Sequence, residues 1–197
     1  MTLTEMRALA RRDLKDEDSQ NYRWTDDEID RAVLRAVSEL SKHVPREMKD
    51  TIATTDGSRE IDISSLADRV SMDKVEFPAD QHPGSFQRFS VYRDTLTLLG
   101  DLEGDGDDCY VYWSKAHTLD GATSTIPFIY ESLVALGATA FAVISQSQYH
   151  SNFANTGGEH VDRDYAFWGR NRLKQFHGEL KRISLSRKLK TGRFYVE

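Results

Sequence analysis

The chain has 197 residues, 29% of them charged, and a formal net charge of -6. This length suits one compact domain or two small lobes. The acidic balance disfavours a duplex-DNA-binding protein, which needs a basic face. A single cysteine, Cys109, excludes an internal disulfide and a cysteine-based zinc cluster. No apolar run near the N-terminus resembles a signal peptide, and the most apolar stretch, 133–144, is too short to span a bilayer, so we expect a cytoplasmic product.

Two helices are predicted at the start of the chain, over 2–15 and 26–44. Each has a capping box, Thr2 with Glu5 and Thr25 with Glu28, in which hydroxyl and carboxylate satisfy backbone amides at the helix N-terminus. Apolar residues then recur at helical spacing, and Pro45 marks the end of the second helix.

A small antiparallel β-sheet is predicted over about 50–117, inserted between helices. Segments 51–54 and 60–63 flank a Thr-Asp-Gly-Ser turn and are predicted to pair as a hairpin. Further strands are expected at 70–77, which alternates partly in polarity, at 87–92 and 95–99, which form a pair joined by Arg93-Asp94, and at 109–113 after the acidic loop.

Two long helices are predicted after the sheet, over 127–150 and 160–184. Pro127 occupies the first turn of the earlier helix, which is apolar on nearly every side. Such a helix is buried all round. In a chain of this size, we expect its own core to cover one face and a neighbouring subunit the other. The predicted subunit-interface residues are Leu136, Ala140, Phe141 and Ile144.

The last segment, 185–197, is basic and lacks a core pattern, so an extended C-terminal arm is predicted. Its apolar residues are poorly suited to water, which favours an arm that becomes ordered on a partner. The alternative interpretation is a frayed terminus or a DNA-touching basic tail. The predicted partner-binding residues are Arg187, Lys188, Lys190, Arg193, Phe194 and Tyr195.

An acidic loop spans 101–108, with carboxylates at Asp101, Glu103, Asp105 and Asp107. It fits the opening of a calcium-binding loop loosely, but the twelfth position is Tyr112 instead of a bidentate glutamate. Two interpretations stay open. The loop is a solvated tip facing outward, or it lines a passage and keeps phosphates from adhering.

No catalytic pattern is found. Phosphate-binding glycine motifs, a Gly-x-Ser-x-Gly elbow and a His-Glu-x-x-His helix are all absent from the sequence. The six histidines are scattered, and no partner signature surrounds Cys109. The sequence therefore predicts a non-enzymatic protein without cofactor or metal.

Taken whole, the chain resembles the head-to-tail connector (adaptor) family of tailed bacteriophages. The resemblance covers most of the chain and is one of overall pattern. Its main stretches are Leu3-Thr4-Glu5-Met6-Arg7, Tyr22-Arg23-Trp24-Thr25-Asp26-Asp27-Glu28, Thr54-Thr55-Asp56-Gly57-Ser58, Val111-Tyr112-Trp113, Leu133-Val134-Ala135-Leu136-Gly137-Ala138 and Trp168-Gly169.

The resemblance implies an α+β fold: a mainly α-helical bundle with an inserted small antiparallel β-sheet and a C-terminal arm, in a single adaptor domain over 1–184. It implies a homo-oligomeric ring, generally twelve-fold, between the portal protein and the next neck or tail protein. Genomic DNA would pass through this ring without sequence-specific binding, and the arm would contact the portal. The chain would belong to the virion neck and carry no catalytic residues. The alternatives are another neck component (a stopper or tail-completion protein) and a small DNA-binding regulator.

Overall fold

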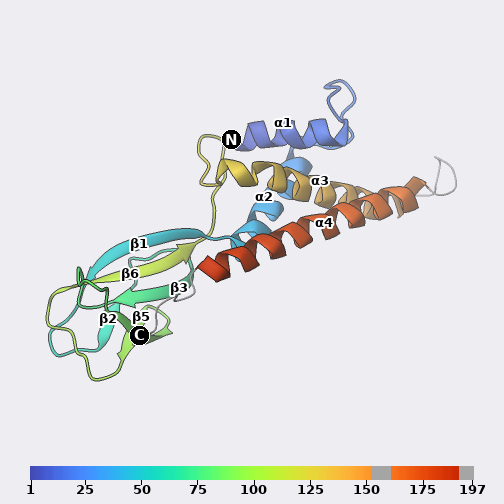
Figure 1. The fold of residues 1–197 in the computed structure, drawn as a ribbon. Helices are drawn as coiled ribbons and strands as arrows, with labels where there is room; N and C mark the ends of the chain where they lie inside the picture. Colours follow the sequence, from blue (N-terminus) through green and yellow to red (C-terminus); the bar gives the residue numbers. More distant parts are fainter. Residues whose placement is uncertain (152–160, 191–197) are drawn as a thin grey trace. The chain divides into compact units, whose positions relative to one another are not determined.

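The computed structural model describes the backbone of residues 1–151 and 161–190, and the side chains of 1–147 and 165–186. Its described part contains four helices and a six-stranded antiparallel curled sheet, which confirms the α+β class. The chain divides into two compact units (Figure 1). The helical unit comprises 1–44 and 117–197, and the β unit comprises 45–116.

The helical unit contains α1 (Leu3–Leu14), α2 (Asp26–His43), α3 (Phe128–Ser151) and α4 (Val161–Lys190). Both predicted capping boxes are confirmed. The Thr2 hydroxyl accepts a hydrogen bond from the backbone amide of Glu5, and the Thr25 hydroxyl accepts one from the amide of Glu28. In each box the glutamate carboxylate accepts a hydrogen bond from the backbone amide of the threonine. These caps fix where α1 and α2 begin.

Helix α4 continues six residues beyond the boundary predicted at residue 184. The prediction of an extended arm beginning at 185 was therefore wrong for 185–190. Residues 185–190 contain no glycine or proline, and leucine, arginine and lysine have good helix propensity. The absence of a core-facing apolar pattern did not stop the helix, because local propensity sufficed to extend it from a packed segment.

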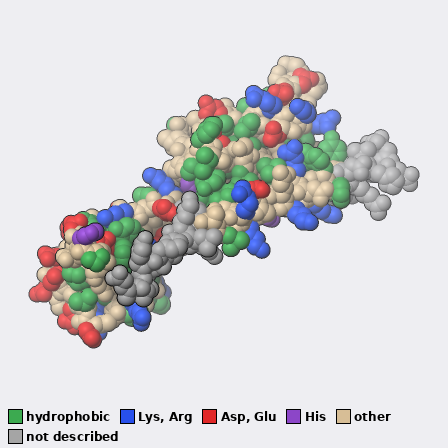
Figure 2. All heavy atoms as spheres, viewed as in Figure 1, with side chains coloured by type: hydrophobic (Ala, Val, Ile, Leu, Met, Phe, Trp, Pro, Cys, Tyr) green, Lys and Arg blue, Asp and Glu red, His purple; other side chains and the backbone are tan. Residues whose placement is uncertain are grey.

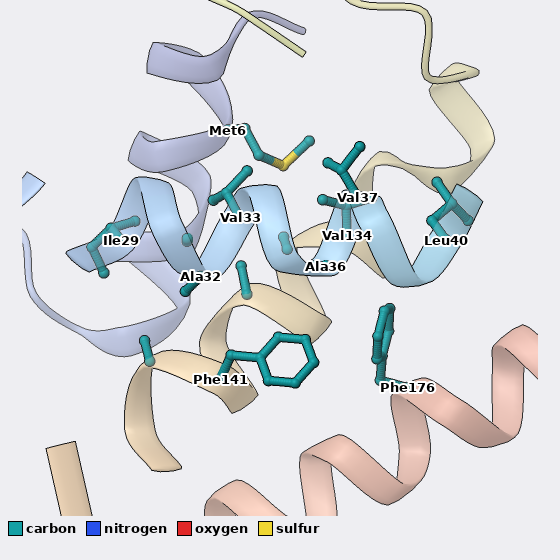
Figure 3. Packing of buried hydrophobic residues seen from close by; sticks show 14 of the residues in the cluster. Met6, Ile29, Ala32, Val33, Ala36, Val37, Leu40, Val134, Phe141 and Phe176 are labelled. Carbon is teal, nitrogen blue, oxygen red and sulfur yellow. The ribbon is translucent and has the colours of Figure 1, made fainter. Parts of the chain in front are cut away.

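The core of the helical unit is organised around α2 (Figure 3). Met6 from α1 lies on one side of α2, and Phe141 from α3 and Phe176 from α4 lie on the other. The two phenylalanine rings meet edge to face, with centroids 6.1 Å apart. Close approach depends on Gly137 of α3, where an added Cβ would lie 2.8 Å from the Phe176 ring.

A buried charged network joins α1 to the loop before α2. The Arg11 guanidinium, 5% exposed, bonds to the carboxylates of Asp16 and Asp26 and to the carbonyl oxygen of Trp24. Asp16, 3% exposed, also accepts the backbone amide of Arg23 at 2.8 Å. The network satisfies polar groups that the turn between the helices would otherwise bury unpaired.

The β unit contains six strands in the spatial order β1-β6-β3-β4-β5-β2. Their bounds are β1 Arg46–Ala53, β2 Glu60–Asp62, β3 Arg69–Glu76, β4 Phe86–Tyr92, β5 Thr95–Leu99 and β6 Asp108–Lys115. The four strands predicted within 70–113 are present, and the hairpin formed by β4 and β5 is confirmed. The interior contains ten buried residues: Ile61, Ile63, Leu66, Val75, Phe77, Leu96, Leu98, Cys109, Val111 and Trp113.

The predicted hairpin between 51–54 and 60–63 was wrong. Strand β1 pairs with β6, β2 pairs with β5, and they lie at opposite ends of the strand order. The turn between them bonds to the acidic loop instead. The Gly57 amide donates to the Gly104 carbonyl at 2.8 Å, and the Gly104 amide donates to the Ser58 carbonyl at 2.7 Å. The predicted Thr-Asp-Gly-Ser turn is present, but β1 pairs with the distant strand β6 and not with the strand that follows the turn.

Helix α3 is longer than the apolar stretch recognised in the sequence. Its segment Phe128–Ser147 is long and apolar enough to cross a membrane by length and composition alone. More than half of this segment is buried against the rest of the chain, as in a core helix. Helix α3 contacts α1, α2 and α4.

Candidate interaction surfaces

Two of the four predicted subunit-interface residues lie inside the helical unit. Ala140 is fully buried, and Phe141 belongs to the core with the Arg35 guanidinium over its ring. Gly169 of α4 approaches closely here, since a Cβ on it would lie 2.9 Å from Ile144. Ala140 and Phe141 are therefore not available to a neighbour without unfolding, and the prediction was wrong for them. The apolar side chains of α3 pack against α2 and α4 of the same chain.

The other two predicted interface residues, Leu136 and Ile144, are half-buried. Leu136 lines an open groove of about 530 Å³ between the first half of α3 and the last half of α4. The groove has apolar walls from both helices. Its full lining is Ile129, Tyr130, Ser132, Leu133, Leu136, Glu179, Arg182, Ile183 and Ser186.

The charges at the groove neutralise each other. The Arg182 guanidinium donates twice to one carboxylate oxygen of Glu179, at 3.0 and 2.7 Å. Both side chains are accessible to solvent, so the ion pair adds little to the stability of the protein.

One residue of the groove lining, Ile129, and two apolar residues next to lining residues in the sequence, Phe128 and Leu185, are exposed to solvent. Phe128 is 83% exposed, Ile129 is 72% exposed and Leu185 is 54% exposed. Contiguous exposed apolar residues of this size usually mark an interaction site. The sequence did not reveal the groove, because Phe128 and Ile129 were counted with the buried helix. Their position immediately after Pro127, in the first helical turn, was the available signal.

The acidic loop between β5 and β6 is anchored at Gly104. A Cβ there would lie 2.4 Å from the Thr55 carbonyl oxygen, so only glycine fits against the turn after β1. The four carboxylates predicted as a possible channel lining, Asp101, Glu103, Asp105 and Asp107, are all exposed. Glu103 lies 3.4 Å from Arg59, and Asp105 accepts the amide of Asp107. The four carboxylates thus lie in solvent, while the backbone of the loop is held at Gly104 by hydrogen bonds to the turn after β1.

Negative charge is concentrated in the β unit. Residues 45–116 contain eight Lys and Arg against fifteen Asp and Glu, a net charge of -7. The rest of the chain contains eighteen Lys and Arg against seventeen Asp and Glu. Figure 2 shows carboxylate side chains spread over the visible face of the β unit. The acidity of the protein is therefore a property of this unit.

The predicted partner-binding residues lie at or beyond the edge of the described structure. Arg187, Lys188 and Lys190 belong to the last turns of α4, and their side chains are outside the described residues. Arg193, Phe194 and Tyr195 are outside the described residues altogether.

Cys109 is a buried strand residue. Burial, followed by the nearby Asp108 charge, raises the pKa of its thiol to about 11, so it is not a nucleophile near neutral pH. Among the described residues, no group of three or more His, Cys, Asp or Glu side chains could hold a metal ion.

No protein-family model matches the chain, and a comparison with curated proteins finds no significant match.

Proposed function

We propose that the protein is a structural subunit of a phage neck, a head-to-tail adaptor that forms a ring between the portal and the next neck or tail protein. The ring, twelve-fold to match the portal, is part of the passage for genomic DNA. The protein acts in the virion after assembly in the host cytoplasm, and it performs no catalysis.

The observation that supports this most directly is the separation of charge between the two units. A net charge of -7 on the β unit repels phosphates, so DNA passes without adhering. The helical unit is nearly neutral and has exposed apolar residues at the start of α3, which suits protein contacts. Protein docking and DNA passage are thus assigned to different units.

The portal contact is assigned to the end of α4 and the residues after it. Removing 191–197 together with the changes Arg187→Gln, Lys188→Gln and Lys190→Gln should abolish binding to portal rings, because basic contacts and aromatic anchors are lost together. Co-sedimentation and particle images of the chain mixed with its portal measure this. The unaltered chain should add one ring per portal.

The matched control changes three exposed basic residues elsewhere on α4, Arg170, Lys174 and Lys181, to glutamine. This control removes the same charge and should still bind. An unaltered chain that forms no ring on the portal would contradict the proposed function. Equal loss in both variants would reject the C-terminal contact and indicate a general charge effect.

The acidic loop is expected to ease DNA passage. Changing Asp101, Asp105 and Asp107 to asparagine and Glu103 to glutamine should leave folding and assembly intact, since all four side chains are exposed. DNA release from assembled particles should slow by roughly tenfold, because local repulsion of phosphates is lost. Time-resolved release measured with a DNA-binding dye tests this.

The control for the loop is the set Asp13→Asn, Glu17→Gln and Asp27→Asn on the helical unit, whose side chains are also exposed. It should release DNA at the normal rate. Normal release by the loop variant as well would show that the loop is a solvated tip and does not line the passage.

A further inference from the structure

Apolar side chains project into solvent at both walls of the groove between α3 and α4. On the α3 wall, Ile129 lines the groove and is mostly exposed. Phe128 is more exposed than any other large apolar side chain in the described part of the chain, and it lies one helical turn before the lining residue Ser132. On the α4 wall, the exposed Leu185 lies one turn after the lining residue Arg182. The rim of an apolar hollow therefore carries apolar projections of its own.

A projection beside a hollow is complementary to a second copy of the same surface. When a two-fold rotation relates the copies, the projection of each enters the hollow of the other, and one patch serves both sides of the contact. Every apolar side chain in such a contact is withdrawn from water twice, once in each copy, which doubles its contribution to association. A second copy thus satisfies the projection and the hollow together.

The charges of the patch are also self-complementary. Glu179 and Arg182 sum to zero, so two copies of the patch do not repel each other. Their ion pair within the chain uses one carboxylate oxygen and the guanidinium nitrogens Nε and Nη2. Within the described residues, the other carboxylate oxygen and Nη1 have no hydrogen-bond partner. A two-fold rotation that brings Glu179 of one copy to Arg182 of the other forms the reciprocal pair at the same time.

We infer that the face of the helical unit around this groove binds a second copy of the chain and forms a two-fold dimer. Phe128 and Ile129 of each copy enter the groove of the other and meet Leu136, while Glu179 and Arg182 pair between the copies. Neighbours in a cyclic ring present different patches to each other, so this dimer is a form of the free chain. Its opening during ring assembly is the one step that rests on the proposed function.

Sedimentation equilibrium of the full chain at several concentrations tests the inference. The unaltered chain should interconvert between monomer and dimer, with no larger species. Ile129→Asp should raise the dissociation constant of the dimer at least about tenfold, because it places a carboxylate against apolar walls. The variant should fold normally, since Ile129 is exposed and an acidic residue suits the first turn of α3.

The matched control is Leu34→Asp on α2, which changes an exposed apolar residue outside the groove lining. It should leave the dissociation constant unchanged. Equal weakening by both variants would overturn the assignment of the contact to the groove. A full chain that stays monomeric up to about 0.1 mM would overturn the dimer and leave the groove to another occupant. Larger species that Ile129→Asp removes would overturn the two-fold arrangement in favour of a head-to-tail contact.

A charge exchange tests the reciprocal pairing. Glu179→Arg alone and Arg182→Glu alone should each weaken the dimer at least about tenfold, because like charges then face each other across the interface. An equimolar mixture of the two variants, one carrying a mass label, should recover a mixed dimer. Each variant has lost the ion pair within its own chain, so recovery on mixing can come only from pairing between copies. Absence of recovery would overturn the two-fold pairing of these residues.

Neither measurement uses the portal. A chain that dimerises but adds no ring to the portal would contradict the proposed function alone. A monomeric chain that does add a ring would contradict the dimer alone.

Discussion

Replacing Asp16 with alanine is expected to lower the free energy of unfolding by about 3–5 kcal/mol, because it leaves the buried Arg11 charge poorly compensated. Arg11 would keep the Trp24 carbonyl, the Tyr22 ring and Asp26, whose side chain is more than half exposed, but it would lose its one buried carboxylate. The backbone amide of Arg23 would lose its acceptor as well. Urea unfolding followed by circular dichroism measures the change.

The neighbouring residue provides the matched control. Glu17 lies 3.8 Å from Arg12, and both side chains are exposed to solvent. Glu17→Ala should change the unfolding free energy by less than about 0.5 kcal/mol, because exposed ion pairs add little stability. If Asp16→Ala lowers the free energy of unfolding by less than about 1 kcal/mol, the network around Arg11 orients the loop before α2 but adds little to stability.

Local signals in the sequence predicted the helices well. The capping boxes at Thr2 and Thr25 bring together residues three positions apart, so both the start and the reason for each helix could be recognised without the fold. Strand pairing is different. The partner of β1 is β6, more than fifty residues later in the sequence, and the Thr55–Ser58 turn indicated a closer partner that the chain does not use.

The interaction surfaces were only partly predictable for the same reason. Periodicity showed that α3 is apolar all round, but it did not show which face its own helices cover. Ala140 and Phe141 were assigned to a subunit interface and lie in the core, whereas Phe128 and Ile129, which fall inside the predicted helix 127–150 without an assignment of their own, lie in solvent. The difference depends on Gly169, which lets α4 approach α3 at Ala140, and no local pattern announces that approach.

Close helix packing also predicts a large effect at Gly137. Gly137→Ala is expected to destabilise the protein by about 1–3 kcal/mol, although alanine favours the helix by about 1 kcal/mol relative to glycine. The added Cβ would lie 2.8 Å from two atoms of the Phe176 ring and 3.0 Å from the Ala36 Cβ. Neither neighbour can move easily, since the ring is fully buried and Ala36 belongs to α2.

The matched control is Gly178→Ala on α4, where an added Cβ meets no atom within 4 Å. It should stabilise the protein by about 0.5–1 kcal/mol, because only the backbone entropy of glycine is removed. The two substitutions are chemically identical. Opposite signs of their effects on the free energy of unfolding in urea would therefore separate the effect of packing from that of helix propensity. Replacing the ring with a smaller side chain should relieve the clash: Phe176→Leu should cost less in the Gly137→Ala background than alone. Equal costs of Phe176→Leu in both backgrounds would mean that α3 and α4 separate to accept the methyl group, and that the contact between Gly137 and Phe176 does not determine how closely the two helices pack.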